Sequence, residues 1–112
     1  MLLPTDRINL RKNKYRKQGT WGDATLADFW KMAVLCFPEK KAVMDNQGLS
    51  LTYQELDHAS SKLAAFFLEQ GIHPGDFISF QIPGWAEFTI IYIACLKTGA
   101  VANPILPCLR AN

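Results

Sequence analysis

Cysteine is scarce in this sequence, and its placement excludes a disulfide framework. Cys36, Cys95 and Cys108 are odd in number, far apart and set among apolar residues, and no Cys-x-x-Cys pair occurs. A structural zinc site uses closely spaced ligand pairs, and a small secreted scaffold uses an even set of cysteines. The three residues are therefore predicted to be reduced thiols of a cytoplasmic protein.

Long hydrophobic runs are also missing. The longest one, residues 88–96, is interrupted by Thr89 and is far shorter than the ~20 apolar residues that cross a bilayer. The basic start of the chain leads into Gln18, Gly19 and Thr20, where a signal peptide would have its apolar core. We expect a cytoplasmic location, and peripheral contact with the inner membrane face is left open.

The chain lacks a strong excess of charge, since its 112 residues carry a net charge of only +2. That balance gives no reason to expect nucleic acid as a partner. The charge is unevenly spread, however: residues 1–20 hold six basic residues and one acidic residue, a balance of +5 that leaves −3 for the remainder. Residues 1–24 are predicted to be a basic N-terminal arm or an extended lead-in, separate from residues 25–112. Its basic residues are Arg7, Arg11, Lys12, Lys14, Arg16 and Lys17.

Recognisable catalytic motifs are absent as well. The glycines never cluster into a phosphate-binding loop or a dinucleotide fingerprint. No serine stands in a nucleophile elbow, and no two acids have the spacing of an acid–base pair. His58 and His73 are interpreted as surface residues, and Asp57 as part of a solvated helix face. The sequence therefore predicts no catalytic residue and no metal site in this chain.

The sequence does contain well-marked secondary-structure elements. A helix is predicted from Thr25, which with Asp28 forms an approximate capping box, up to Pro38. A hairpin follows, with strands at residues 42–45 and 49–52 and a three-residue turn between them. The helix that begins at Thr25 is predicted to have one apolar face, which consists of Leu26, Phe29, Trp30, Ala33 and Phe37.

The next helix has the clearest boundaries. Thr52 and Glu55 are spaced as a capping box at its start, and Gly71 is placed to end it in the left-handed conformation. Asp57 is expected to lie away from the buried face of this helix. That face is predicted to consist of Leu56, Ala59, Leu63, Phe66 and Phe67.

The remaining segment predicts a parallel crossover. Strands at residues 77–82 and 100–105 flank an almost entirely apolar helix at residues 85–98, which Gly99 caps. With the preceding helix, hairpin and helix, this order predicts a layered α/β fold. Parallel sheets normally contain several strands covered on both faces. Only two parallel strands are predicted here, so the sequence is expected to represent an incomplete domain.

An ordered set of cap, turn and strand residues over positions 42–110 resembles the N-terminal region of the large domain of adenylate-forming enzymes. This superfamily comprises acyl-CoA synthetases, aryl-acid adenylating enzymes and luciferases. Each match alone is weak because caps and turns are common, but the whole set in this order is specific. The matching residues are Leu51, Thr52, Tyr53, Glu55, Leu56, Gly71, Pro74, Gly75, Asp76, Pro83, Glu87, Phe88, Gly99, Ala100, Val101, Asn103 and Pro104.

Residues 15–28 resemble the lead-in of bacterial fatty-acid CoA ligases and of dihydroxybenzoate-adenylating enzymes, and residues 103–110 resemble CoA ligases of short, medium and alicyclic carboxylic acids. Together they favour a bacterial short- or medium-chain fatty acyl-CoA synthetase. This resemblance implies an AMP-forming acid–thiol ligase that uses a carboxylic acid, ATP, Mg²⁺ and CoA and works through an acyl-adenylate. It also implies that residues 25–112 are the first part of the AMP-binding domain, with the phosphate-binding and lid motifs downstream. The chain alone is then inactive scaffold.

The resemblance brings the segment after the last predicted strand near the CoA channel, namely Pro107, Cys108, Leu109 and Arg110. Arg110 would lie beside the CoA channel, where a guanidinium can pair with a CoA phosphate, and an ordinary surface role is the open alternative. The sequence departs from the family after Pro83, where Gly84 replaces the usual asparagine, which puts a hydrogen bond from that position in doubt. A second interpretation of the whole chain is an independent interaction module that binds an anionic partner through the basic arm.

Overall fold

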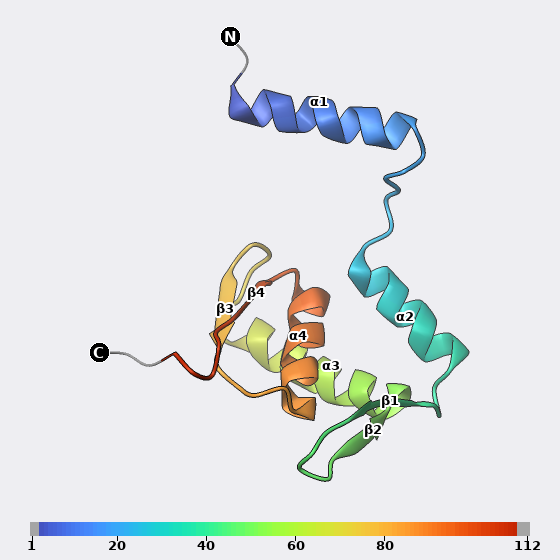
Figure 1. Ribbon diagram of the computed structural model, residues 1–112, viewed down its shortest axis with the longest axis vertical. Coiled ribbons are helices and arrows are strands. Elements are labelled where there is room, and N and C mark those ends of the chain that lie inside the picture. The colour runs from blue at the N-terminus through green and yellow to red at the C-terminus, as the bar shows by residue number, and fades with distance from the viewer. Residues whose placement is uncertain (1–2, 110–112) are drawn as a thin grey trace.

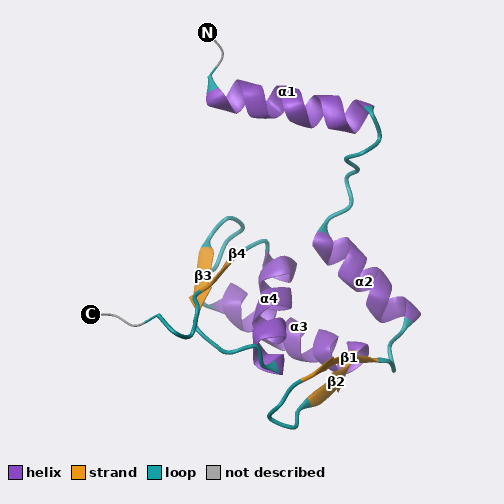
Figure 2. Cartoon of the chain, viewed as in Figure 1, coloured by secondary structure: helices purple, strands orange, loops and turns teal. Residues whose placement is uncertain are grey.

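Two packed helices, α3 (Tyr53–Glu69) and α4 (Ala86–Thr98), form the centre of the computed structural model, which describes residues 3–109 (Figure 1). One short two-stranded sheet lies near each end of α3 (Figure 2). The layered α/β fold predicted from the sequence is confirmed, and the described residues represent part of such a domain.

The core between α3 and α4 depends on small side chains. Leu56, Ser60 and Ala64 are buried at four-residue intervals along α3, and small residues let a second helix approach closely. The Ser60 hydroxyl donates to the Asp57 carbonyl at 3.0 Å, so its burial leaves no unpaired donor. The predicted face was wrong in detail, because Phe66 is exposed. The facing residues buried on α4 are Ala86, Ile93, Ala94, Cys95 and Thr98.

The antiparallel sheet consists of β1 (Lys41–Met44) and β2 (Ser50–Thr52). The Asp45 N–H donates to the Leu49 carbonyl at 3.0 Å, which closes the three-residue turn that the sequence predicts. Gly48 has a φ of +87° in this turn, a conformation that favours glycine.

The parallel sheet pairs β3 (Phe77–Phe80) with β4 (Val101–Pro104), and α4 connects the two strands. This is the predicted crossover, and β3 and β4 are each two residues shorter than expected. Left-handed glycines end both helices of the core as predicted, with φ values of +87° at Gly71 and +76° at Gly99.

The two predicted capping boxes differ in their outcome. At Thr25 the reciprocal pair is confirmed: its hydroxyl accepts from the Asp28 N–H at 3.2 Å, and its own N–H donates to the Asp28 carboxylate at 2.8 Å. Thr52 likewise accepts from the Glu55 N–H at 3.1 Å. However, the Glu55 carboxylate accepts from the Thr52 hydroxyl, not from its backbone N–H, so the second box is only half formed.

The N-terminal segment is helical, so the prediction of an extended lead-in was wrong. Helix α1 (Pro4–Lys17) begins with a proline, and the Asp6 carboxylate accepts from the Leu3 N–H at 3.2 Å at its start. The glycines that suggested an extended arm lie beyond the end of α1, at positions 19 and 22. None of its residues is buried, and it stands away from the other elements (Figure 1).

Helix α2 (Leu26–Cys36) reaches α3 and α4 along only one side. Trp30 and Ala33 are half-buried there, and the Trp30 ring lies 5.6 Å from that of Tyr53. Leu26 and Phe29, which were predicted on the same apolar face, are exposed. The predicted face therefore contains more residues than α3 and α4 cover.

Candidate functional site

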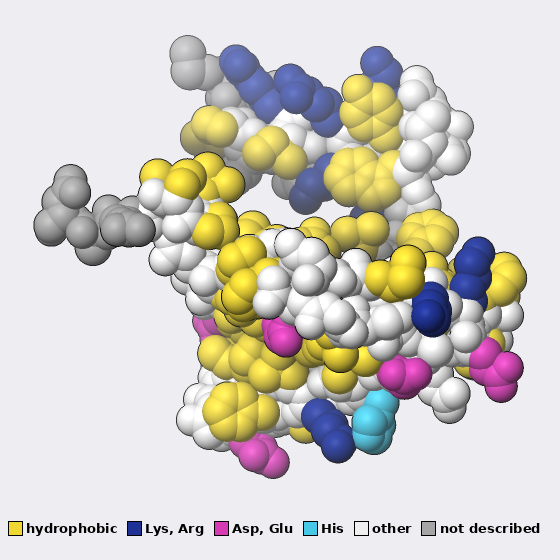
Figure 3. Space-filling view, turned by 60° about the horizontal axis from the view of Figure 1, so that its bottom comes forward, with side chains coloured by type: hydrophobic (Ala, Val, Ile, Leu, Met, Phe, Trp, Pro, Cys, Tyr) yellow, Lys and Arg dark blue, Asp and Glu magenta, His cyan; other side chains and the backbone are white. Residues whose placement is uncertain are grey.

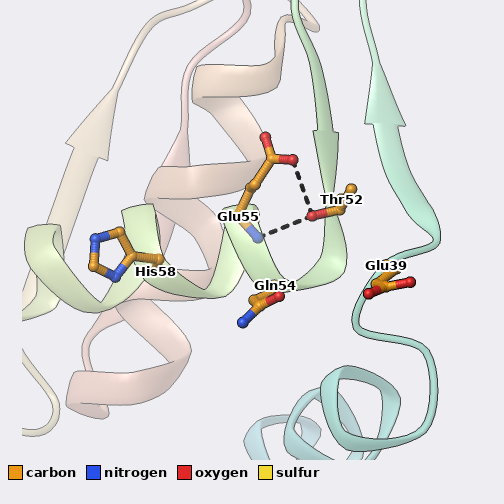
Figure 4. Close-up of a pocket in the computed structure, with 5 residues that line it drawn as sticks. All are labelled: Glu39, Thr52, Gln54, Glu55 and His58. Carbon is orange, nitrogen blue, oxygen red and sulfur yellow. Dashed lines mark hydrogen bonds between the residues drawn. The ribbon is translucent and has the colours of Figure 1, made fainter.

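A shallow hollow of about 430 Å³ lies beside the start of α3. Its lining residues are Glu39, Thr52, Gln54, Glu55 and His58 (Figure 4). The only hydrogen bonds drawn among them join Thr52 to Glu55, and these begin the helix. Glu39 and His58 lie on opposite sides of the view and do not point toward each other (Figure 4). The Thr52 hydroxyl serves as the N-cap of α3, so the paired polar groups of this hollow have a structural explanation.

A second hollow, of about 350 Å³, lies where α2, α3 and α4 meet. Asp57 from α3 is its central polar group. One carboxylate oxygen, Oδ1, accepts from Trp30 Nε1 at 2.9 Å and from Lys97 Nζ at 2.6 Å. Each of the three helices contributes one of these residues, so the carboxylate joins them.

The ammonium group of Lys97 donates three hydrogen bonds at this junction. Besides the carboxylate, Nζ donates to the Asp57 carbonyl at 2.9 Å and to Ser61 Oγ at 2.6 Å. The side chain of Lys97 is 21% exposed and that of Asp57 37% exposed. Partial burial opposes the charge on Asp57, but the hydrogen bonds from Lys97 and Trp30 prevail and hold the pKa of Asp57 below its ordinary value.

The Asp57 junction therefore fixes helix positions and offers no free reactive group. The expectation that Asp57 belongs to a solvated face was wrong. The sequence contained one signal for this site that the periodicity argument did not use: Ser60, Ser61 and Ala64 are small residues close to Asp57 on the helix, where another element can approach. The small residues alone do not indicate which element packs against them.

A second long-range contact caps α4. Trp85 stands at the N-cap position, but its side chain makes no capping hydrogen bond. Instead, Asp45 Oδ2 of the hairpin turn accepts from the Ala86 N–H at 2.9 Å. This bond is the main reason that the pKa of Asp45 lies below its ordinary value, and the N–H groups of Leu49 and Gln47 add to it.

Gln81 holds the end of the described chain. Its amide nitrogen Nε2 donates to the carbonyls of Leu106 at 2.9 Å and Leu109 at 2.6 Å, so the turn at residues 106–109 is tied to the end of β3. Of the residues predicted near a ligand, Pro107, Cys108 and Leu109 are exposed in this turn. Arg110 lies outside the described residues. The role of Gln81 was not predicted, because a polar residue after a strand gives no indication of its partner.

The described residues do not fit a magnesium site. Within residues 3–109, no group of three histidine, cysteine or acidic side chains is arranged to hold a metal ion.

Cys95 is buried, and burial raises the pKa of its thiol, whereas Cys36 and Cys108 are exposed. No helix in the same range has the length and apolar character needed to cross a membrane.

Comparison with known proteins gives consistent matches. The family model described as "AMP-binding enzyme" matches residues 30–112. The medium-chain fatty-acid–CoA ligase of Escherichia coli K12 is 57% identical over 100 residues, which is 89% of this chain and 18% of that protein. The salicyl-AMP ligase of Mycobacterium tuberculosis is 35% identical over 107 residues, which is 90% of this chain and 19% of that protein.

Solved structures agree with these relatives. MbtA of Mycobacterium smegmatis superimposes with a TM-score of 0.78 at 34% identity, over 98% of this chain and 20% of that one. A putative long-chain-fatty-acid CoA ligase of Rhodopseudomonas palustris gives 0.73 at 28% identity, over 79% of this chain and 22% of that one. The chain spans less than a fifth of the length of the two ligases compared by sequence.

Proposed function

The chain belongs to the AMP-binding enzyme family, and on that basis we propose that it is part of an ATP-dependent ligase that joins a short- or medium-chain fatty acid to CoA. The observation that carries this proposal is the 57% identity to a medium-chain fatty-acid–CoA ligase. A ligase and a synthase acting on salicylate are less similar, at 35% and 29%. The comparisons give no support to the alternative of an independent interaction module.

The proposed reaction has two steps. A carboxylate oxygen of the fatty acid attacks the α-phosphorus of ATP, which forms the acyl-adenylate and releases pyrophosphate. The thiolate of CoA then attacks the acyl carbonyl carbon, which forms the thioester and releases AMP. Neutralising the phosphates requires Mg²⁺ and oriented donors, and residues 3–109 contain no group of three histidine, cysteine or acidic side chains arranged to hold a metal ion.

We assign the described residues a supporting role in this reaction. Residues 25–112 form the first part of the AMP-binding domain, and residues 1–24 form a separate basic segment. Asp57 and Asp45 fix the helices to each other and to the hairpin, and Gln81 fixes the turn that precedes Arg110. Catalytic loops hold their geometry only on such rigid elements. Arg110 is proposed to pair with a phosphate of CoA, and the protein is proposed to be cytoplasmic with peripheral contact at the inner membrane face.

Acid-dependent exchange of pyrophosphate into ATP by the full-length gene product tests the proposal. We expect exchange with hexanoate or octanoate and none with salicylate, followed by release of AMP when CoA is added. The 112-residue chain alone should give no exchange. Exchange with salicylate in place of the fatty acids would overturn the substrate class, and exchange by the isolated chain would overturn the supporting role.

A further inference from the structure

Helix α1 carries a line of positive charge on one side. Arg7, Arg11 and Lys14 are spaced by four and three residues, which places them on one face of the helix. Basic and hydrophobic side chains lie side by side over this part of the molecule (Figure 3). The remaining chain carries a net charge of −3, so the positive charge is concentrated in this segment.

Apolar side chains border this charged line on both sides. Leu3 and Leu10 lie three or four residues from the basic positions on one side, and Ile8 and Tyr15 do so on the other. Their exposed fractions are 65%, 58%, 51% and 43%, so no part of the described chain covers them. We call the line and its borders the basic–apolar face.

The opposite side of α1 has different chemistry. Asp6, Asn9 and Asn13 follow one another there at helical spacing. Three basic residues also lie outside the line of Arg7, Arg11 and Lys14, namely Lys12, Arg16 and Lys17. Arg16 is engaged within the chain: its guanidinium lies 3.6 Å from the Asp23 carboxylate and 5.9 Å from the centre of the Trp21 indole ring. The helix therefore has one side suited to an anionic, partly apolar surface.

We propose that the basic–apolar face lies flat on a bilayer that contains anionic lipids. Arg7, Arg11 and Lys14 pair with lipid phosphates while the apolar borders enter the boundary between headgroups and acyl chains. A helix of this length extends about 21 Å, which suits a position along the surface. Nucleic acid would use the charges but would leave the four apolar side chains in water. The inference deepens, and rests on, the peripheral membrane contact proposed above, not on the ligase reaction.

Vesicle sedimentation with the full-length protein tests this proposal, using phosphatidylcholine vesicles with and without phosphatidylglycerol. We expect binding only with phosphatidylglycerol, and binding that weakens as salt is added. Each basic residue at such a surface contributes about fivefold in partitioning, so the triple variant R7Q/R11Q/K14Q should bind roughly a hundredfold more weakly. Glutamine preserves helix propensity, so the fold of α1 is retained.

Two comparisons make the test specific. Arg11→Gln and Arg16→Gln remove the same charge, but Arg16 lies on the far side of a helix roughly 10 Å across, about one Debye length away. Only Arg11→Gln should lower vesicle binding about fivefold. Ile8→Ser with Leu10→Ser should also weaken vesicle binding while leaving heparin binding unchanged.

Equal losses for Arg11→Gln and Arg16→Gln, an unchanged Ile8/Leu10 variant, or stronger binding to DNA than to the vesicles would overturn the proposal. Exchange of pyrophosphate with butyrate in the absence of vesicles serves as an independent measurement. It should be the same in the triple variant and the parent protein, so failure of membrane binding is distinguishable from failure of the ligase assignment.

Discussion

The carboxylate of Asp45, in the turn of the β1–β2 hairpin, accepts a hydrogen bond from the backbone N–H of Ala86 at the start of α4. The two residues are 41 positions apart. The first N–H groups of a helix have no partner within the helix, and an acidic side chain nearby also interacts favourably with the helix dipole. The hairpin thus supplies the cap that Trp85 and Gly84 do not.

Replacement of Asp45 by alanine is expected to lower the thermal midpoint of the full-length protein by several degrees, because the Ala86 N–H and two N–H groups of the turn lose their acceptor. Asp45→Asn should fall between the parent protein and Asp45→Ala, because its single amide oxygen can accept either from the Ala86 N–H or from the two turn N–H groups, but not from both sets. Asn46→Ala, in the same turn, is the matched control. Calorimetry on the three variants checks the prediction, which fails if Asp45→Ala and Asn46→Ala unfold alike.

The local elements could be predicted because neighbouring residues determine them. Thr25 with Asp28 marked one helix start, and Gly71 and Gly99 marked two helix ends, all within a few residues of the boundary they set. An extended lead-in was the wrong prediction because Gly19 and Gly22, which favour irregular backbone, lie beyond the end of α1 and not within it.

The contacts that join the elements could not be predicted in the same way. Asp57 and Lys97 are 40 residues apart, and nothing near either residue specifies the other. An aspartate beside a predicted buried face is usually solvated, so the periodicity of α3 favoured the wrong environment. The partial burial of this carboxylate and its bonds to Trp30 and Lys97 follow only from the packing of three helices.

The Asp57–Lys97 pair should show coupling in a double-mutant cycle. Asp57→Ala is expected to lower the free energy of unfolding by about 1–2 kcal/mol because both Lys97 and Trp30 lose an acceptor. Lys97→Met keeps most of the apolar stem and should cost less. The coupling energy should be about 0.5–1 kcal/mol, since the pair is only partly buried. Denaturant unfolding measures all three values, and strictly additive variants would contradict an interaction between the two side chains.

Stability should fall at acidic pH through three named carboxylates. The pKa values of Asp28, Asp45 and Asp57 all lie below the ordinary value because each accepts hydrogen bonds in the folded chain. A carboxyl with a lowered native pKa contributes its full stability above the unfolded value of about 3.9 and loses it as pH falls through the native pKa.

We therefore expect the thermal midpoint to be steady from neutral pH down to about pH 5 and to drop steeply below the unfolded carboxyl pKa. Asp45→Asn and Asp57→Asn should each flatten this drop, because an amide does not titrate. Glu69→Gln is the control, as Glu69 is exposed at the end of α3. A drop of equal steepness in all three variants would show that other groups control the acid transition.

The proposed role of Arg110 leads to a prediction about CoA. Gln81 holds the carbonyls of Leu106 and Leu109, so the backbone that leads into Arg110 starts from a fixed point at the end of β3. A charge-assisted bond between a guanidinium and a phosphate is worth about 1.5–3 kcal/mol. Arg110→Ala should therefore raise the KM for CoA by roughly tenfold to a hundredfold, while exchange of pyrophosphate into ATP, which does not involve CoA, stays unchanged.

Arg110→Lys distinguishes a phosphate contact from a purely structural role. Lysine keeps the charge but loses the two-pronged geometry, so the KM for CoA should lie between the values of the parent protein and Arg110→Ala. Dephospho-CoA lacks the 3′-phosphate. If that phosphate is the partner of Arg110, the KM values of the parent protein, Arg110→Lys and Arg110→Ala should differ less for dephospho-CoA than for CoA. If Arg110→Ala lowers the exchange rate and CoA-dependent turnover equally, Arg110 supports the fold and does not contact CoA.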